Sequence, residues 1–207
     1  MNKLVIIVFL LAVVMINSGC PKPCIEANYS FSVNSQIAPD LDSVNVGDTI
    51  FLISSFPTKL IDQTTGQMIE YGNSTGVGSN LGIVKLINGN SMPLDAVKDF
   101  NFISVTGTIY NDLNVPNPNK FQQLKYQEVN NFYTLKIGIS PKQKGTYSLG
   151  IGNGLSNGRL KNRNCEKASF SITLFNTNQH LSYFSAWNPN GTLGDYEKSR
   201  SFFLKVY

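Results

Sequence analysis

Short runs in which β-branched and aromatic residues alternate with polar ones recur along most of the chain, and they limit its fold more than any other feature. In residues 132–139 and 146–151 every second residue is large and apolar. Such alternation is typical of strands that bury one face. The predicted strands are 29–37, 49–54, 82–87, 102–110, 121–129, 132–139, 146–151, 168–175 and 202–207.

Turn-forming clusters separate these predicted strands, and long amphipathic helical patterns are missing. Glycine and asparagine, which tolerate positive φ angles, are frequent in the clusters. The clearest clusters are 71–74, 88–90, 115–119 and 153–158, and the only predicted helices are short, at 95–100 and 179–187. About nine strands joined by turns predict an all-β chain folded as an antiparallel β-sandwich.

Two local segments resemble immunoglobulin-like domains of bacterial envelope proteins. Residues 42–52 contain V-N-V-G-D-T-I, and in such domains this stretch passes through a Gly-Asp turn into an inward-facing second strand. Residues 144–149 (K-G-T-Y-S-L) resemble the start of a penultimate strand, with Tyr147 packed over the corner. The resemblance implies an immunoglobulin-like sandwich with a short C-terminal helix and a final strand. It implies no ligand, because this fold has many functions.

The first residues of the chain are typical of an export signal. Residues 4–16 form an unbroken apolar run that follows Lys3. At about 1.5 Å per residue a helix of this length spans about 20 Å, less than the roughly 30 Å hydrocarbon core of a bilayer. The run therefore indicates a signal peptide and not a membrane-spanning helix.

The residues after the apolar run resemble the lipobox of bacterial lipoproteins. Ser18 and Gly19 precede Cys20, and Asn17 stands where leucine is usual, a loosened form similar to lipoproteins of the Bacteroidota. The resemblance implies a signal peptide over 1–19, an acylated Cys20 that anchors the chain to a membrane, a linker over 20–27 and one domain over 28–207. Acyl chains contribute about 0.8 kcal/mol of membrane affinity per buried methylene. The alternative is an ordinary secretory peptide.

The lipoprotein resemblance leaves two further cysteines, Cys24 and Cys165. An oxidising envelope compartment would favour a disulfide between them, and the alternative is two free thiols. No acidic residue lies between Cys20 and Glu26. Surface-exported lipoproteins of the Bacteroidota usually carry acidic residues there, so the periplasmic side is favoured over the cell surface.

Charge and motif content argue against nucleic-acid binding and against catalysis. The 17 Lys and Arg residues exceed the 13 Asp and Glu residues by only four, and they form no dense basic stripe for a phosphate backbone. His180 is the single histidine, and without a nucleophile motif it is expected to be packed. No catalytic residue, metal site or cofactor is predicted. A carboxylate-dependent hydrolase remains an alternative; its acids would be Glu70, Asp99, Asp112 and Glu128.

Aromatic residues near the C-terminus favour binding. The cluster comprises Tyr183, Phe184, Trp187 and Tyr196, beside asparagine-rich loops. Flat rings next to amides suit glycan or peptide recognition. The alternative is that the same rings pack a helix onto the sandwich. The sequence thus predicts a non-catalytic binding or accessory module with a glycan or protein partner, or else a structural envelope protein without a small ligand.

Two further surface features are predicted. Arg159, Lys161 and Arg163 alternate with uncharged residues, so an extended backbone would place the three charges on one side. Facing an anionic membrane surface, each would contribute about 1 kcal/mol of attraction. The alternative is a solvated loop. Ser43 and Thr49 lie in D-S-V and D-T-I triplets that resemble the O-glycosylation acceptor of the Bacteroidota. Both residues are therefore candidate modification sites.

Overall fold

The computed structural model describes residues 24–89, 92–111, 120–161, 164–176 and 179–207. Cys20, Asp112 and Arg163 lie outside this part of the chain. The described strands are β1 (Ile25–Ala38), β2 (Ser43–Val44), β3 (Ile50–Pro57), β4 (Lys59–Ile61), β5 (Met68–Glu70), β6 (Gly78–Leu86), β7 (Leu94–Asp95), β8 (Phe100–Thr106), β9 (Thr108–Tyr110), β10 (Phe121–Lys125), β11 (Gln127–Val129), β12 (Phe132–Pro141), β13 (Gly145–Ile151), β14 (Gly154–Leu155), β15 (Arg159–Lys161), β16 (Asn164–Leu174) and β17 (Ser201–Val206). The described helical segments are the 3₁₀ turn η1 (Val97–Asp99), α2 (Ser182–Trp187) and α3 (Asp195–Lys198). No helix in these ranges is long and apolar enough to cross a membrane.

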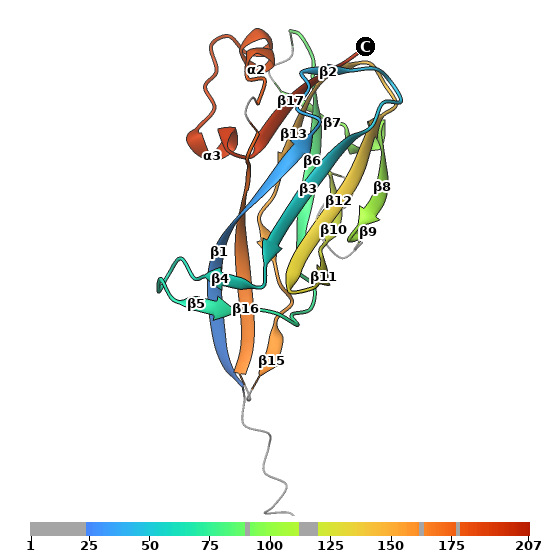
Figure 1. Cartoon of the computed structure of the whole chain (residues 1–207). Helices are drawn as coiled ribbons and strands as arrows, with labels where there is room; N and C mark the ends of the chain where they lie inside the picture. The colour runs from blue at the N-terminus through green and yellow to red at the C-terminus, as the bar shows by residue number, and fades with distance from the viewer. Residues whose placement is uncertain (1–23, 90–91, 112–119, 162–163, 177–178) are drawn as a thin grey trace, which may run out of the picture.

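The strands form two layers around one apolar core, so the predicted all-β sandwich is confirmed (Figure 1). In the first layer, β12 lies between β3 on one side and β8 and β11 on the other. The second layer has the order β10-β6-β13-β17-β2. Alternate residues of β12 point into the core, as its sequence pattern predicts.

β1 and β16 join the two layers at one edge. Residues 25–35 of β1 pair in parallel with β16, and residues 35–38 pair with β3. The pair buries Phe31 against Phe170 and Val33 beside Ile172. β2 and β17 are also parallel, so the sandwich is antiparallel except at these two pairs. β1 begins at Ile25, inside the segment 20–27 that the sequence assigns to a linker.

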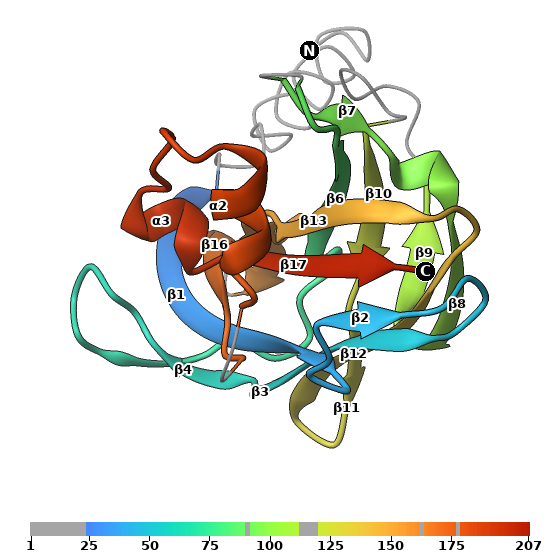
Figure 2. The same ribbon diagram turned by 90° about the horizontal axis from the view of Figure 1, so that it is seen from above.

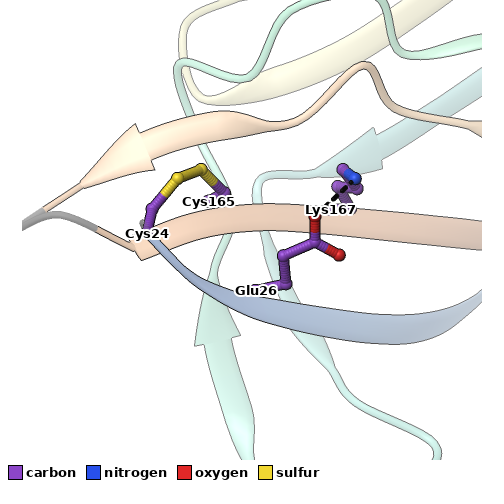
Figure 3. The surroundings of a disulfide bond; sticks show 4 residues. All are labelled: Cys24, Glu26, Cys165 and Lys167. Atoms are coloured by element: carbon purple, nitrogen blue, oxygen red, sulfur yellow. Dashed lines mark hydrogen bonds and ion pairs between the residues drawn. A yellow bond between two sulfur atoms is a disulfide. The ribbon is translucent and has the colours of Figure 1, made fainter. Parts of the chain in front are cut away.

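A disulfide joins Cys24 to Cys165, as the sequence analysis predicts. The two Cα atoms are 5.4 Å apart although 141 residues separate the cysteines in sequence. Two residues beyond each cysteine, the Lys167 ammonium lies 3.1 Å from a Glu26 carboxylate oxygen (Figure 3). The disulfide thus fastens the start of β1 to the start of β16, at the bottom of Figure 1.

The chain crosses from the first layer to the second at Gly107. The predicted strand 102–110 is broken here, because β8 pairs with β12 whereas β9 pairs with β10. Gly107 has a φ of 85°, and a Cβ atom at this position would lie 2.6 Å from the carbonyl oxygen of Lys125. Only glycine fits such a crossing. The predicted strand 121–129 breaks in the same way at Tyr126, between β10 and β11.

Both segments that resemble immunoglobulin-like domains adopt the expected local structure. The chain runs from β2 through Gly47, at a φ of 91°, into β3, whose Ile50 and Leu52 are buried. Tyr147 is fully buried, and its hydroxyl donates a hydrogen bond to the Gln143 carbonyl at 3.0 Å. β13 is not the penultimate strand, however, because β14, β15, β16 and β17 follow it.

The helices are shorter than predicted. Of 95–100 only η1 is helical, and of 179–187 only α2. His180 has a φ of 55° and lies outside α2, which begins at Ser182. It is buried against the Phe202 ring, with centroids 5.0 Å apart. Figure 2 shows α2 and α3 lying together beside β17 and β16, outside the layers.

Candidate binding groove

A groove of about 950 Å³ opens at the edge where the two layers separate. β8 forms one wall and belongs to the first layer, whereas β10 forms the other wall and belongs to the second. These two strands do not pair with each other, since β8 pairs with β12 and β10 pairs with β6 and β9. The groove occupies the space between them.

Aromatic rings form the apolar floor of the groove. Phe100 and Phe102 enter it from alternate positions of β8, and Phe121 enters from β10. Phe100 is buried and meets the Tyr147 ring edge-on, with ring centroids 4.9 Å apart. Phe102 and Phe121 are only partly buried. The floor thus offers partly exposed rings that rest on a rigid core.

The rim of the groove is cationic. Lys98, Lys120 and Lys142 line it together with one acid, Asp95. The Lys120 ammonium lies 3.6 Å from a carboxylate oxygen of Asp95, and both side chains are about half exposed, so this pair contributes less than about 1 kcal/mol. Lys98 and Lys142 have no acidic partner in the described part of the chain. The rim therefore favours anionic groups.

A buried amide fixes the polar wall of the groove. The Gln122 side-chain nitrogen donates hydrogen bonds to the Tyr110 carbonyl at 3.1 Å and to the Asn111 side-chain oxygen at 3.3 Å. Gln122 is buried, and Asn111 is exposed at the rim. This geometry holds the Asn111 amide towards the groove. Taken together, the lining suits a ligand that has both an apolar part and negative charge.

The groove lies at the opposite end of the sandwich from the disulfide. Besides the walls β8 and β10, residues of β7 and η1 line it. β7 and the start of β8 lie in the upper right of Figure 1, whereas β15 and the starts of β1 and β16 lie at the bottom. No group of three or more His, Cys, Asp or Glu residues is arranged to hold a metal ion in the described ranges.

Two rings of the predicted aromatic cluster, Phe184 and Trp187, pack against the sandwich. Trp187 is half-buried, and its indole nitrogen donates a hydrogen bond to the Ile87 carbonyl at 3.0 Å. Phe184 lies between Trp187 and Phe203, with ring centroids 5.9 Å from each. These contacts pack α2 onto the sandwich, which is the alternative that the sequence left open.

The two tyrosines of the predicted aromatic cluster have separate environments. Tyr196 is 60% exposed, and the Arg200 guanidinium lies 4.3 Å from the centre of its ring. Tyr183 is half-buried. Its burial is the main cause that raises the pKa of its phenol, and the nearby Asp42 carboxylate is the second. Ligand binding at Tyr183, Trp187 and Tyr196 stays a prediction.

Two of the four acids of the hydrolase alternative approach each other. A Cβ atom on Gly72 would lie 3.2 Å from one Glu128 carboxylate oxygen and 3.3 Å from one of Glu70. Glu128 accepts a hydrogen bond from the Asn73 amide at 2.8 Å. Asp99 is buried on η1, and its carbonyl accepts a hydrogen bond from the Lys142 amide just beyond the end of β12. Glu128 instead pairs with Tyr133 near the start of β12. Glu70 and Glu128 therefore lie apart from Asp99, and Asp112 lies outside the described residues.

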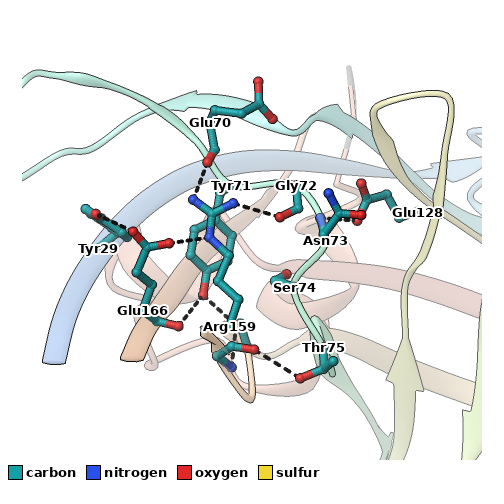
Figure 4. Close-up of polar contacts among 12 residues, drawn as sticks. Tyr29, Glu70, Tyr71, Gly72, Asn73, Ser74, Thr75, Glu128, Arg159 and Glu166 are labelled. Carbon is teal, nitrogen blue, oxygen red and sulfur yellow. Dashed lines mark hydrogen bonds and ion pairs between the residues drawn. The ribbon is translucent and has the colours of Figure 1, made fainter. Parts of the chain in front are cut away.

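Arg159 does not face solvent or a membrane, which corrects the sequence-based expectation of a basic side. It lies opposite Glu166 in the β15–β16 register and forms an ion pair with it. Its guanidinium also donates to the carbonyls of Glu70 and Gly72 and lies 4.9 Å from the centre of the Tyr71 ring (Figure 4). Because β15 pairs with β16, the Arg159 side chain points inward towards Glu166. The alternation of charges in the sequence could not reveal this partner.

Tyrosine hydroxyls complete this internal cluster. The Tyr71 hydroxyl lies 2.7 Å from the Ser156 hydroxyl and donates to the Glu166 carbonyl at 3.2 Å. The Tyr133 hydroxyl donates to the Tyr71 carbonyl at 2.7 Å. Burial is the main cause that raises the pKa of both tyrosines. Because its groups satisfy one another, the cluster stabilises the disulfide end of the domain.

The candidate modification sites lie in different settings. Thr49 is exposed just before β3, whereas Ser43 is half-buried in β2 and its hydroxyl donates to the Asp42 carboxylate at 2.9 Å. O-glycosylation of either residue stays a prediction. The groove itself was missed by the sequence analysis. Only the F-x-F pattern of Phe100 and Phe102 was a local signal for it.

Comparisons with known proteins add little to this description. No family model matches the chain, and no curated protein matches it. Among solved structures, the seventh ScaB type I cohesin from Pseudobacteroides cellulosolvens is similar over 72% of this chain and 94% of that chain, with 13% sequence identity and a TM-score of 0.30. The β-sandwich assignment therefore rests on the strand pairings and the buried core described above.

Proposed function

We propose that the chain is a lipid-anchored protein of the bacterial cell envelope, acylated at Cys20, whose β-sandwich is a non-catalytic binding or accessory module. The lipobox-like residues before Cys20 support the anchor. The disulfide between Cys24 and Cys165 supports export, because disulfides persist in oxidising compartments. The absence of acidic residues directly after Cys20 supports the periplasmic side.

The position of the groove relative to Cys24 carries the proposal. Three residues lie between Cys20 and Cys24, so the two cysteines are four positions apart in the chain and are separated by about 14 Å at most. Acylation of Cys20 would therefore hold the disulfide end of the domain close to the membrane. The groove, at the opposite end, would then face away from the bilayer, where a protein or glycan of the envelope can reach it.

A structural envelope role without a small ligand is the second candidate. It is favoured by the packing of Trp187 and Phe184, which use their rings to hold α2 on β17. In that case the lysines of the rim would contribute solubility alone. The two candidates differ in whether reversing the charge of the rim affects contacts with other envelope components.

Acylation is tested by the mass of the protein extracted from membranes. The expected mass is that of a chain starting at Cys20 with acyl groups attached, and Cys20→Ser should release the protein from the membrane fraction. An unmodified mass in a soluble fraction would overturn the anchor. Protease treatment of intact cells then separates the two faces of the membrane, because a periplasmic domain is digested only after lysis.

Binding through the groove is tested with the full membrane-extracted chain. The Lys98→Glu/Lys142→Glu variant should lose crosslinks to envelope components that the wild type forms. Lys59→Glu/Lys144→Glu is the matched control, since these exposed lysines lie outside the groove. Equal crosslinking by the two double variants would exclude the groove as the binding surface and favour the structural role.

A further inference from the structure

The strand that forms one groove wall has an open edge. β8 pairs with β12 on one side, and no described strand pairs with its other side. Natural proteins usually protect such edges with charges, proline or a covering segment. The sequence of β8 is Phe-Asn-Phe-Ile-Ser-Val-Thr, without charge or proline. β8 is therefore available for pairing with another chain.

The hydrogen-bonding pattern shows which backbone groups face the open edge. The Lys142 amide donates to the Asp99 carbonyl at 2.8 Å, so these two residues form a hydrogen-bonded pair at the end of the β8–β12 ladder. Along an antiparallel ladder, hydrogen-bonded pairs of residues alternate with non-hydrogen-bonded pairs. Asn101 and Ile103 therefore also belong to hydrogen-bonded pairs with β12. The N–H and C=O groups of Phe102 and Ser104 consequently point away from β12.

Side chains on both faces of β8 are placed to meet an added strand. Phe100 and Phe102 point into the groove. On the other face, Ile103 is 56% exposed and Val105 is 54% exposed. A strand added at the edge of β8 would send alternate side chains into the groove and onto this outer apolar face. Both faces would then become buried.

Charge complementarity selects the partner chemistry. Lys98 lies in η1, which directly precedes β8, and Lys142 directly follows β12 at the same end. Neither has an acidic partner among the described residues, and Lys120 faces them across the groove. An extended segment that carries carboxylates would therefore be favoured at this end of β8.

We propose that the open edge of β8 accepts an extended acidic peptide segment of a partner protein as an additional antiparallel or parallel strand. The inference rests on the proposed function and names the partner class of the same groove. Backbone hydrogen bonds to Phe102 and Ser104 provide the affinity, the three lysines select acidic segments, and the aromatic floor receives an apolar side chain.

The probes are acetylated and amidated nonapeptides in which valine, leucine, isoleucine or phenylalanine alternates with glutamate. Matched peptides carry lysine in place of glutamate, and hexagalacturonate serves as an acidic glycan without backbone amides. Binding to the full detergent-solubilised chain is measured by fluorescence anisotropy. The glutamate peptides are expected to bind at least about tenfold more tightly than the lysine peptides.

Ser104→Pro tests the edge directly. Proline removes an N–H that faces away from β12, so the β8–β12 ladder is kept while the open edge is blocked. The matched control is Ser104→Ala, which removes only the hydroxyl that donates to the Gly107 carbonyl at 2.7 Å. The proline variant is expected to bind the glutamate peptides about tenfold more weakly than the alanine variant. If the proline variant does not fold, shifts of the Phe102 and Ser104 amide resonances on peptide addition replace it.

Each outcome separates the inference from the proposed function. Equal peptide affinity of the proline and alanine variants, or unshifted amides, would overturn strand addition. Hexagalacturonate binding without peptide binding would assign the groove to acidic glycans and overturn the peptide partner, while the binding module stands. If no probe binds, the inference is wrong. The proposed function falls with it only if the Lys98→Glu/Lys142→Glu variant also keeps all wild-type crosslinks.

Discussion

Arg159 and Glu166 form an ion pair directly across β15 and β16, one residue from the disulfide. Their side chains are only 11% and 9% exposed, and the Tyr71 ring covers the guanidinium. Glu166 also accepts a hydrogen bond from the Tyr29 hydroxyl at 3.4 Å. Strand β15, which has only three residues, is thus held in place by its side chains as much as by its backbone.

Breaking this ion pair should be costly. Arg159→Met or Glu166→Gln leaves one charge buried and unpaired, so each change should lower the free energy of unfolding by about 3–5 kcal/mol. The double variant should lose less than the sum of the two. Urea denaturation of the four proteins measures the coupling. The exposed Lys120–Asp95 pair is the control, and its removal should cost less than about 1 kcal/mol.

Stability should fall in acid partly because of Asp62. Its carboxylate accepts hydrogen bonds from the Ser30 amide at 2.8 Å and the Thr65 hydroxyl at 2.7 Å, and these bonds lower its pKa in the folded state. The stabilisation is therefore complete above the unfolded pKa of about 3.9 and is lost as the pH falls through the folded value. Asp62→Asn should flatten the dependence of unfolding free energy on pH below about 4. An unchanged slope would contradict this assignment.

The stability of the fold should decline at alkaline pH because of Tyr147. Burial, with a contribution from the nearby Asp99 carboxylate, raises the pKa of its phenol to about 12. A raised phenol pKa means that the folded state favours the protonated form, so stability is retained below the unfolded pKa of about 10 and declines between 10 and 12. Ultraviolet titration should show one tyrosine fewer ionising above pH 11 in Tyr147→Phe. If the variant titrates like the wild type, the assignment is wrong.

Removal of the disulfide should destabilise the whole domain. The cysteines are 141 residues apart, and the chain-entropy model gives an upper value of about 5 kcal/mol for a loop of that size. Cys24→Ser/Cys165→Ser should lower the unfolding free energy towards this limit. Hydrogen exchange should increase first at the paired starts of β1 and β16. Unchanged exchange there would show that strand pairing and the Arg159 cluster suffice.

The single tryptophan should report the docking of α2. Trp187→Phe keeps a ring but loses the hydrogen bond to the Ile87 carbonyl, which should cost about 1 kcal/mol. Trp187→Ala should also increase hydrogen exchange in α2, without weakening peptide binding in the groove. A loss of ligand binding in Trp187→Ala, with α2 still protected, would instead favour the aromatic surface predicted from the sequence.

The local sequence pattern was sufficient to predict most of the strands and the class of fold. Alternation in 132–139 and 146–151 requires only that one strand face be buried, and β12 and β13 follow it closely. The disulfide between Cys24 and Cys165 was also predicted, through the lipoprotein resemblance. Short elements were missed, such as the β4–β5 hairpin, because strands of three residues leave too little periodicity to detect.

Tertiary structure alone decided which side chains meet. The alternation of Arg159 with Lys161 was read as a basic side, but pairing with β16 placed Glu166 opposite Arg159 and turned it inward. Lys98, Lys120 and Lys142 come together only because the chain changes layers at Gly107 and leaves β8 and β10 apart. A sequence period determines which face of a strand is buried, whereas strand partners are set by contacts between residues far apart in the chain.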